Sequence, residues 1–334
     1  MFMMGPMAEP KFELGPVLDA LGGAGPRYTS EEVVERAGVE REFLDRLWRA
    51  LGMALADDDE ALYSDDDVES AKRVAALRAA GVPDDGILEI SRVLGMTMSQ
   101  LAAANREMII AALGKTQASE KELSERLTAA IDAFMPTVGE SLGYVLTLHL
   151  REQIRHDATA GVDGDGAQRV TICFADMVGF TQLGEKLAPA ELGHVTGKLG
   201  ELASSVVEPP LRLVKMIGDA AMLAGPEPAE VLDAAIELVD RASREGGDFP
   251  ILRAGVACGE ATARGGDWYG APVNLASRIT DRARPGSVLA SEEVQNALAD
   301  DYQWSFAGGK RLKGFDDEVK LFRARRGNGS GSAA

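Results

Sequence analysis

The sequence is poor in the features that mark secreted and membrane-spanning proteins. Its 334 residues include only two cysteines, Cys173 and Cys258, each within an apolar run. Such a chain has no disulfide framework, and a reducing cytoplasm is the expected location. No stretch approaches the roughly 18 uncharged apolar residues that a membrane span needs. The first residues lack a basic region followed by an apolar core, so no secretory signal is expected.

Positive charge is also scarce. Lys and Arg total 35 against 53 Asp and Glu, which gives a net charge of −18 and argues against a broad basic surface for nucleic acid. Residues 1–160 contain 16 basic and 28 acidic residues, whereas residues 161–334 contain 19 and 25. The acidic excess is therefore concentrated in the first half, and no nucleic-acid partner is expected.

Hydrophobic residues make up 46% of the chain, which is enough for folded cores. The length suggests about two domains of roughly 150 residues each. A segment at 156–168 contains several glycines and few apolar residues, which is typical of a linker. The predicted organisation is a domain at 1–155, this linker, a domain at 169–326 and a flexible tail at 327–334.

The first half has helical periodicity and no convincing strand. Thr29 lies three residues before Glu32, the spacing of a capping box, and Ser64 precedes an acidic first turn that favours a helix start. We count six or seven helices, and we expect Pro136 to break or kink the last of them. The sequence therefore predicts an all-α domain.

The second half changes to short β-branched runs that alternate with helical segments. The order strand, helix, strand, strand, helix, strand is typical of a ferredoxin-like sheet with helices on one face. Residues 287–291, 292–300 and 302–325 then predict a short strand, a short helix and a closing strand pair. This half is therefore predicted to have an α+β fold.

Two acidic residues of the second half are candidate metal ligands. Asp176 lies where a predicted strand meets a glycine-containing turn and a helix start, and Asp219 lies in a Gly-Asp hairpin turn. Taken singly, Asp176 is as consistent with a helix cap as with a cation site, and Asp219 with an ordinary turn. Two carboxylates on neighbouring strands nevertheless suit a divalent cation that bridges triphosphate oxygens.

Polar residues elsewhere in this half suit phosphate binding. Asn274 and Arg278 are four residues apart on a predicted helix, so they share one face. Arginine can hold phosphate oxygens and stabilise the charge that develops in a transition state. Lys215 lies on the predicted hairpin, and Lys313 lies in a basic turn between the last strands. Taken alone, each of these residues is more typical of an ordinary exposed side chain.

In order and spacing, these motifs resemble those of the class III nucleotidyl cyclases over about residues 168–324. The combination is F-x-D-x-x-G-F-T from Phe174, K-x-x-G-D from Lys215 and D-x-x-G-x-x-V-N-x-x-x-R from Asp267. The resemblance implies a ferredoxin-like class III cyclase catalytic domain that converts ATP to 3′,5′-cyclic AMP and pyrophosphate.

The resemblance also implies a role for each matched position. Asp176 and Asp219 match the residues that bind two divalent cations, Mg²⁺ or Mn²⁺. The remaining matches are the adenine-selecting Lys215 and Asp267, the transition-state residues Asn274 and Arg278, the triphosphate-binding Lys313, and Phe180 and Thr181 as further substrate-binding residues. In this family the site lies between two catalytic domains, so a chain with one such domain is expected to form a head-to-tail homodimer with two equivalent sites.

The choice of base has a physical rationale beside the resemblance. Adenine presents an acceptor at N1 and a donor at N6, which a lysine donor beside an aspartate acceptor satisfies. Guanine would require a carboxylate at the position of Lys215. The sequence therefore favours ATP over GTP, because a wrong polar edge is strongly rejected.

The helical first half is expected to be regulatory, since the layout resembles mycobacterial soluble adenylyl cyclases with a helical N-terminal regulatory domain. His149 and His156 lie near the linker and are candidate pH-sensing residues, with ordinary surface histidines as the alternative. A lipid pocket among the helices that carry Met96, Met98, Met108 and Met135 is a further hypothesis, and a methionine-containing core is the simpler one.

A different class of function remains open for the same half. Its sequence from Tyr28 to Val82 also resembles a MerR-type winged helix-turn-helix region. On that interpretation the chain is a DNA-binding or signalling regulator with a nucleotide-sensing cyclase-like domain. The acidic clusters at 57–60 and 65–67 disfavour contact with DNA phosphates.

Overall fold

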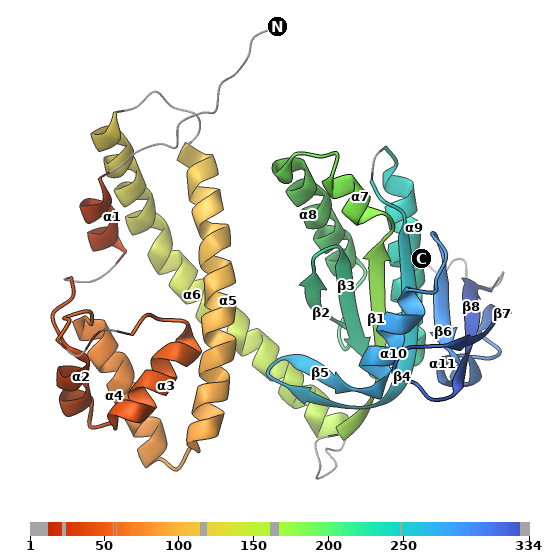
Figure 1. Ribbon diagram of the computed structural model, residues 1–334, viewed down its shortest axis with the longest axis horizontal. Coiled ribbons are helices and arrows are strands. Elements are labelled where there is room, and N and C mark those ends of the chain that lie inside the picture. The colour runs from red at the N-terminus through yellow and green to blue at the C-terminus, as the bar shows by residue number, and fades with distance from the viewer. Residues whose placement is uncertain are drawn as a thin grey trace, which may run out of the picture. The chain divides into compact units, whose positions relative to one another are not determined.

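The structure, a computed structural model, divides into two units, Met1–Gln153 and Ile154–Ala334, and each is described by itself (Figure 1). The residues that it describes are 13–21, 25–55, 57, 59–113, 119–160, 167–247 and 249–327.

The linker predicted at 156–168 overlaps an element at each end. Helix α6 (Glu120–Ala160) extends past residue 156, and strand β1 (Ala167–Met177) begins before residue 169. Residues 161–166, and residues 328–334 of the expected tail, lie outside the described residues. The helical periodicity of the first half therefore persists further than its composition suggests.

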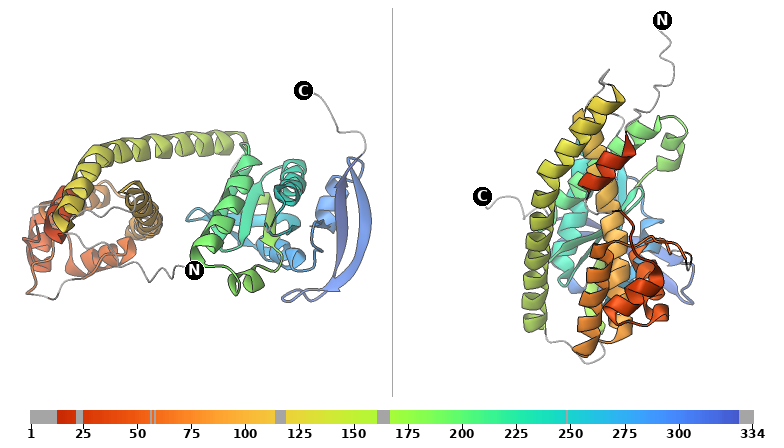
Figure 2. Two further views of the ribbon diagram at one scale, coloured as in Figure 1. Left: turned by 90° about the horizontal axis from the view of Figure 1, so that it is seen from above. Right: turned by 90° about the vertical axis from the view of Figure 1, so that its left-hand side faces the viewer.

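The first unit is helical over its described residues, apart from one antiparallel bridge between Tyr28 and Tyr63. Its two longest helices, α5 and α6, are seen from two further sides in Figure 2. The all-α prediction is confirmed. The helices are α1 (Leu14–Ala20), α2 (Ser30–Ala37), α3 (Arg41–Leu51), α4 (Asp65–Ala79), α5 (Asp84–Leu113) and α6.

Two predicted helix starts form as capping boxes. Thr29 Oγ1 accepts from the backbone N–H of Glu32 at 3.3 Å, and the Glu32 carboxylate accepts from the backbone N–H of Thr29 at 2.9 Å. Ser64 and Asp67 make the same reciprocal pair at the start of α4. Pro136 does not break α6, which continues through it as one helix. The helix tolerates the loss of the one backbone hydrogen bond that proline cannot donate.

Three of the four methionines that were candidates for a core of the first unit lie outside it. Met96, Met108 and Met135 are exposed, so the interpretation of a methionine-containing core is wrong for them. The core instead contains Trp48 and Tyr63, whose rings stack with centroids 5.8 Å apart. These two buried rings pack α3 against the segment that precedes α4.

The second unit contains one eight-stranded mixed sheet with the order β2-β3-β1-β4-β6-β8-β7, and β5 pairs with β4. The order β2-β3-β1-β4 is that of a ferredoxin-like sheet, as predicted. Its other strands are β2 (Arg212–Ile217), β3 (Ala220–Gly225), β4 (Leu252–Arg264), β5 (Asp267–Gly270), β6 (Val288–Ser291), β7 (Tyr302–Arg311) and β8 (Glu318–Arg326). Its helices are α7 (Phe180–Gly184), α8 (Pro189–Ser205), α9 (Pro228–Glu245), α10 (Ala271–Thr280) and α11 (Glu292–Ala297).

Helices cover both faces of this sheet, which corrects the expectation of helices on one face. Helices α8 and α9 pack over one face in a core that includes Cys173 and Val256. Helix α10 packs on the other face, where Ala276 joins Ile172 and its neighbours in a second core. Apolar residues therefore alternate to both sides of β1, which places this strand in the middle of a three-layer unit.

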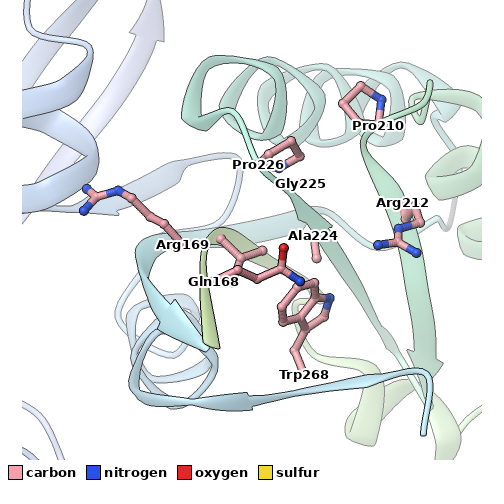
Figure 3. A pocket seen from close by; sticks show the side chains of 9 residues that line it. Gln168, Arg169, Pro210, Arg212, Ala224, Gly225, Pro226 and Trp268 are labelled. Carbon is pink, nitrogen blue, oxygen red and sulfur yellow. The ribbon is translucent and has the colours of Figure 1, made fainter. Parts of the chain in front are cut away.

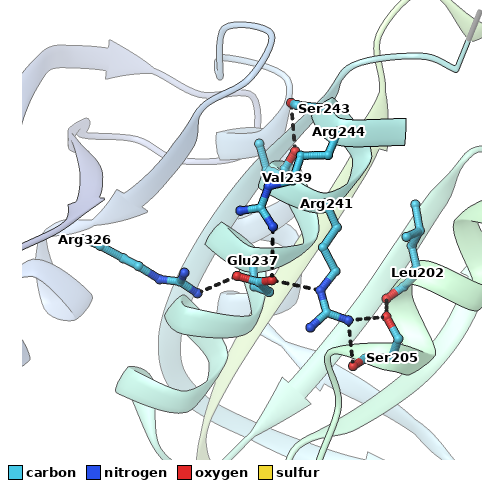
Figure 4. Close-up of polar contacts among 8 residues, drawn as sticks. All are labelled: Leu202, Ser205, Glu237, Val239, Arg241, Ser243, Arg244 and Arg326. Atoms are coloured by element: carbon cyan, nitrogen blue, oxygen red, sulfur yellow. Dashed lines mark hydrogen bonds and ion pairs between the residues drawn. The ribbon is translucent and has the colours of Figure 1, made fainter. Parts of the chain in front are cut away.

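Glu237 of α9 lies at the centre of a cluster of polar contacts between neighbouring elements (Figure 4). Its carboxylate accepts from Arg241 Nε at 2.8 Å and from Arg326 at 2.9 Å, and Arg241 also donates to Ser205 Oγ at 2.9 Å. The hydrogen bond from Arg241 is the main cause that lowers the pKa of Glu237. This cluster joins α8, α9 and β8.

Replacement of Gly255 by alanine is expected to destabilise the second unit. A Cβ at this position of β4 would lie 2.6 Å from the carbonyl oxygen of Ala276, so α10 would have to move away from the sheet. We expect a loss of about 1–3 kcal/mol in the free energy of unfolding, measured by urea denaturation. Gly197→Ala on α8 is the control, because no atom lies within 4 Å of its added Cβ and helix propensity favours alanine. Equal stability of Gly255→Ala and wild type would contradict the argument.

Candidate active site

The two candidate metal ligands meet at one edge of the sheet. Asp176 is the penultimate residue of β1 and is paired in register with Ala220 of β3, directly after the hairpin turn that carries Asp219. The backbone N–H of Met177 donates to the carbonyl oxygen of Asp219 at 3.1 Å. Gly218, at φ 59°, supplies the left-handed residue of this turn. The antiparallel pairing therefore brings together two acidic residues that are far apart in the sequence.

Arg253 contacts Asp176 from the neighbouring strand and was not identified from the sequence. The register of β1 and β4 places the two residues opposite each other. The Nε and one terminal nitrogen of Arg253 both donate to Asp176 Oδ2, at 3.0 and 2.7 Å. The other terminal nitrogen donates to the carbonyl oxygen of Asp281 at 3.2 Å. The apolar run at 250–261 is typical of a strand, but the sequence alone does not reveal the register of this strand with β1.

The surroundings of Asp176 fit a cation. Burial raises the pKa of Asp176, the hydrogen bond from Arg253 opposes this, and the charge of nearby Asp219 raises the pKa further. In the described part of the chain, no three Asp, Glu, His or Cys side chains gather as a metal site. Two carboxylates are nevertheless a donor set that suits Mg²⁺, which takes its remaining ligands from water and substrate phosphates. Asp176 and Asp219 therefore fit a site that nucleotide completes.

Lys215 and Asp267 form an ion pair between β2 and β5. Strand β5 was not predicted from the sequence. In the structure β5 folds back on β4, and the other carboxylate oxygen of Asp267 accepts from the backbone N–H of Trp268 at 2.9 Å. The hairpin therefore fixes the acceptor beside the lysine donor.

Asn274 and Arg278 lie on the exposed face of α10, as their spacing predicts. Arg278 lies 3.8 Å from the carboxylate of Asp281, which follows the end of the helix. The same carboxylate lies 3.9 Å from Arg253. The end of α10 is thus connected through Arg253 to Asp176.

The other candidate residues are placed more loosely. Lys313 is exposed in the turn between β7 and β8, directly after the buried Leu312. Phe180 begins α7 and packs partly against the core, and Thr181 is exposed. In the part of the chain that the structure describes, no hydrogen bond or ion pair joins Lys313, Phe180 or Thr181 to the candidate residues above.

The two candidate histidines both belong to α6. His149 lies exposed on α6. His156 belongs to the same helix, but its side chain lies outside the described residues.

Comparison with known proteins gives the family. The family model for the adenylate cyclase regulatory domain matches residues 10–154, and that for the adenylate and guanylate cyclase catalytic domain matches residues 162–323. The chain is 41% identical over 329 residues to the pH-sensitive adenylate cyclase MT1302 of Mycobacterium tuberculosis, which covers 94% of this chain and 83% of that protein. The chain belongs to the adenylate and guanylate cyclase family.

Other relatives of this cyclase are more distant. It is 34% identical to the uncharacterized protein Rv2212 of M. tuberculosis, over 91% of this chain and 81% of that protein. It is 31% identical to an adenylate cyclase of Streptomyces griseus, over 80% of this chain and 67% of that protein. Among solved structures, the adenylyl cyclase CyaB from P. aeruginosa matches 48% of this chain and 96% of its own, with 21% identity and a TM-score of 0.42. The family resemblance inferred from the motifs is confirmed by the matches to relatives along most of the chain.

A small pocket of the cyclase is lined by residues from the starts of β1 and β2, from the end of β3 and from β5 (Figure 3). Trp268, which follows Asp267, and Arg212, which begins β2, are among its lining residues, together with Gln168. None of the candidate site residues lines it. The pocket therefore does not replace the site predicted from the motifs.

No described helix combines the length and hydropathy that crossing a membrane requires.

Proposed function

We propose that this adenylate cyclase converts ATP to 3′,5′-cyclic AMP and pyrophosphate, with two divalent cations, at two equivalent sites shared between the copies of a homodimer. The observation that carries the proposal is the ion pair of Lys215 and Asp267, which places a donor and an acceptor at one point of the catalytic domain. The names of the relatives MT1302 and the S. griseus protein support the same reaction.

The base is selected by this pair. Lys215 Nζ donates to N1 of adenine, and the carboxylate of Asp267 accepts from the N6 amino group. With guanine, the N1–H would face the lysine donor and the O6 acceptor would face the carboxylate. Both polar groups would then be left without partners in a partly buried place, which costs more than a lost contact alone.

The divalent cations are assigned to Asp176 and Asp219. When bound, they supply positive charge that favours ionisation of the ribose 3′-hydroxyl and offsets the charge of the phosphates. The two carboxylates hold and orient this charge at the end of β1. Burial is the main cause that raises the pKa of Asp176, and a bound cation would favour its charged form.

Residues of α10 and of the last turn act on the sugar and phosphates. Asn274 orients the ribose so that its 3′-oxygen attacks the α-phosphorus in line, and pyrophosphate leaves from the opposite side. Arg278 donates to the α-phosphate oxygens, where negative charge develops. Lys313 pairs with the terminal phosphates, and Phe180 and Thr181 border the substrate beside the metal ligands.

Two features support a homodimer. Asn274 and Arg278 point away from the core on the exposed face of α10, where a second copy can complete a site with them. Apolar side chains are also exposed along α6, among them Tyr144 at 65% and Leu146 at 60%. An exposed apolar surface of this kind marks an interaction site, and a second copy of the chain is the occupant that the shared-site arrangement requires.

The first unit is proposed to regulate the catalytic domain, with a proton as the regulatory signal and exposed His149 as the candidate sensor. The name of the pH-sensitive relative MT1302 supports this. A DNA-binding role is not favoured, although α2 and α3 are joined by a short turn as in a helix-turn-helix. Two arginines of α3 are already paired, Arg41 with Asp45 at 3.0 Å and Arg46 with Asp85 at 3.5 Å.

Purified protein is expected to form cyclic AMP from ATP with Mn²⁺ or Mg²⁺, and much less cyclic GMP from GTP. The measurement is chromatography of the products between pH 5.5 and 8, for the full chain and for residues 161–334. A difference in rate between the full chain and residues 161–334 that changes with pH would support proton regulation through the first unit. Absence of cyclic AMP from both would contradict the proposed reaction.

A further inference from the structure

The guanidinium of Arg253 lies against the Asp176 carboxylate, whose negative charge attracts a cation. Two of its nitrogens converge on the same oxygen, Oδ2, at 3.0 and 2.7 Å. The side chains are 26% and 18% exposed, respectively, so water screens this pair less than it screens a surface pair. Arg253 therefore supplies positive charge that the two acidic residues at this edge otherwise lack.

An arginine in this place opposes a second cation on the same carboxylate. The charges of Asp176 and Asp219 together are −2, and the guanidinium reduces them to −1 before any metal binds. A divalent cation a few ångströms from the guanidinium is repelled by it even at a high effective dielectric constant. The arrangement thus stabilises the metal-free site and weakens its attraction for a cation.

Arg253 also has a second place to bind. One terminal nitrogen donates to the carbonyl oxygen of Asp281 at 3.2 Å, and another lies 3.9 Å from the carboxylate of the same residue. A small rotation away from Asp176 would therefore leave the guanidinium with acceptors on Asp281. Because Arg253 retains these partners, its release from Asp176 costs less than exposing an unpaired buried charge.

We propose that Arg253 is a placeholder cation, which holds Asp176 in the nucleotide-free enzyme and releases it when a divalent cation and a triphosphate arrive together. This inference rests on the proposed function, because it takes Asp176 as a cation ligand. The triphosphate supplies the negative charge that makes a cation and an arginine compatible in one site. The metal alone is then bound weakly, and metal and nucleotide bind cooperatively.

The test is Mn²⁺ binding to the full-length chain without nucleotide, measured by the electron paramagnetic resonance signal of free Mn²⁺. Arg253→Met is expected to bind Mn²⁺ about tenfold more tightly than wild type, since a repelling charge has been removed. Arg253→Gln is the second variant, which keeps a hydrogen-bond donor without the charge and should show the same gain. Mn²⁺ should also raise the melting temperature of either variant more than that of wild type.

Two further variants separate the possible failures. Arg284→Met removes an exposed arginine after α10 and should leave Mn²⁺ affinity within about twofold of wild type. Asp176→Asn combined with Arg253→Met should lose the gained affinity. Equal or weaker binding by Arg253→Met and Arg253→Gln would overturn the placeholder role alone. Retention of tight binding by the double variant would overturn the assignment of Asp176 as a metal ligand, and the placeholder role with it.

Discussion

A mixture of two inactive variants, Asp176→Ala and Asn274→Ala, is expected to regain adenylate cyclase activity. Asp176 lies at the end of β1 and Asn274 on the exposed face of α10, so each variant removes a different half of the proposed shared site. Each variant alone has both of its sites damaged and should lose activity by about 100-fold or more. A heterodimer has one site with both defects and one site with neither.

The amount of recovery is also predicted. Random pairing of equal amounts makes half of the dimers heterodimers, and each of these has one intact site of two. Activity should therefore reach about a quarter of the wild-type value per chain, measured as cyclic AMP after the variants have been mixed and allowed to exchange.

A matched pair of variants provides the control. Asp176 and Asp219 lie together at one edge of the sheet in the same chain. Asp176→Ala and Asp219→Ala therefore damage the same half of the site, and no mixture of them contains an intact one. Recovery in this control, or no recovery in the test mixture, would refute sites shared between two copies.

The family and the ferredoxin-like order could be predicted from the sequence because they depend on motif order and periodicity along the chain. Lys215 and Asp267 were identified in this way, although they lie on strands that pair with different neighbours. Their contact could not be derived, since it depends on how β5 folds back on β4. A four-residue strand after a Gly-Gly turn carries too little periodicity to be recognised.

The contact of Arg253 with Asp176 could not be predicted from the sequence either. It is a single basic residue at the start of an apolar strand, a pattern that is typical of an ordinary strand end. Its function in the site depends on the register of β1 and β4, which places it opposite Asp176. Register is fixed by burial on both faces of β1, and the sequence analysis had assigned helices to only one of them. The face of the sheet on which α10 packs could not be predicted either. It depends on the close approach of α10 to β4, which Gly255 allows because it has no Cβ.

Replacement of Lys215 by methionine is expected to lower the preference of the enzyme for ATP over GTP. Methionine keeps much of the length of the lysine side chain but donates no hydrogen bond. The donor for N1 of adenine is lost, and Asp267 loses the cation with which it is paired in the structure. We expect kcat/KM for ATP to fall about 100-fold, in line with a lost charged hydrogen bond and an acceptor left unpaired.

The ratio of the two substrates distinguishes base selection from a structural effect. Guanine gains nothing from a lysine at this position, because its N1 carries a hydrogen, so kcat/KM for GTP should change little in Lys215→Met. A variant that only disturbed the hairpin would lower both values together. Lys198→Met is the matched control, since Lys198 lies on α8 and pairs with Glu201 and Glu245 at 3.5 Å, away from β2 and β5. It should leave the ATP to GTP ratio at the wild-type value. An unchanged ratio in Lys215→Met would mean that adenine is recognised without the pair of Lys215 and Asp267, since removing a base-specific donor must affect the two bases unequally.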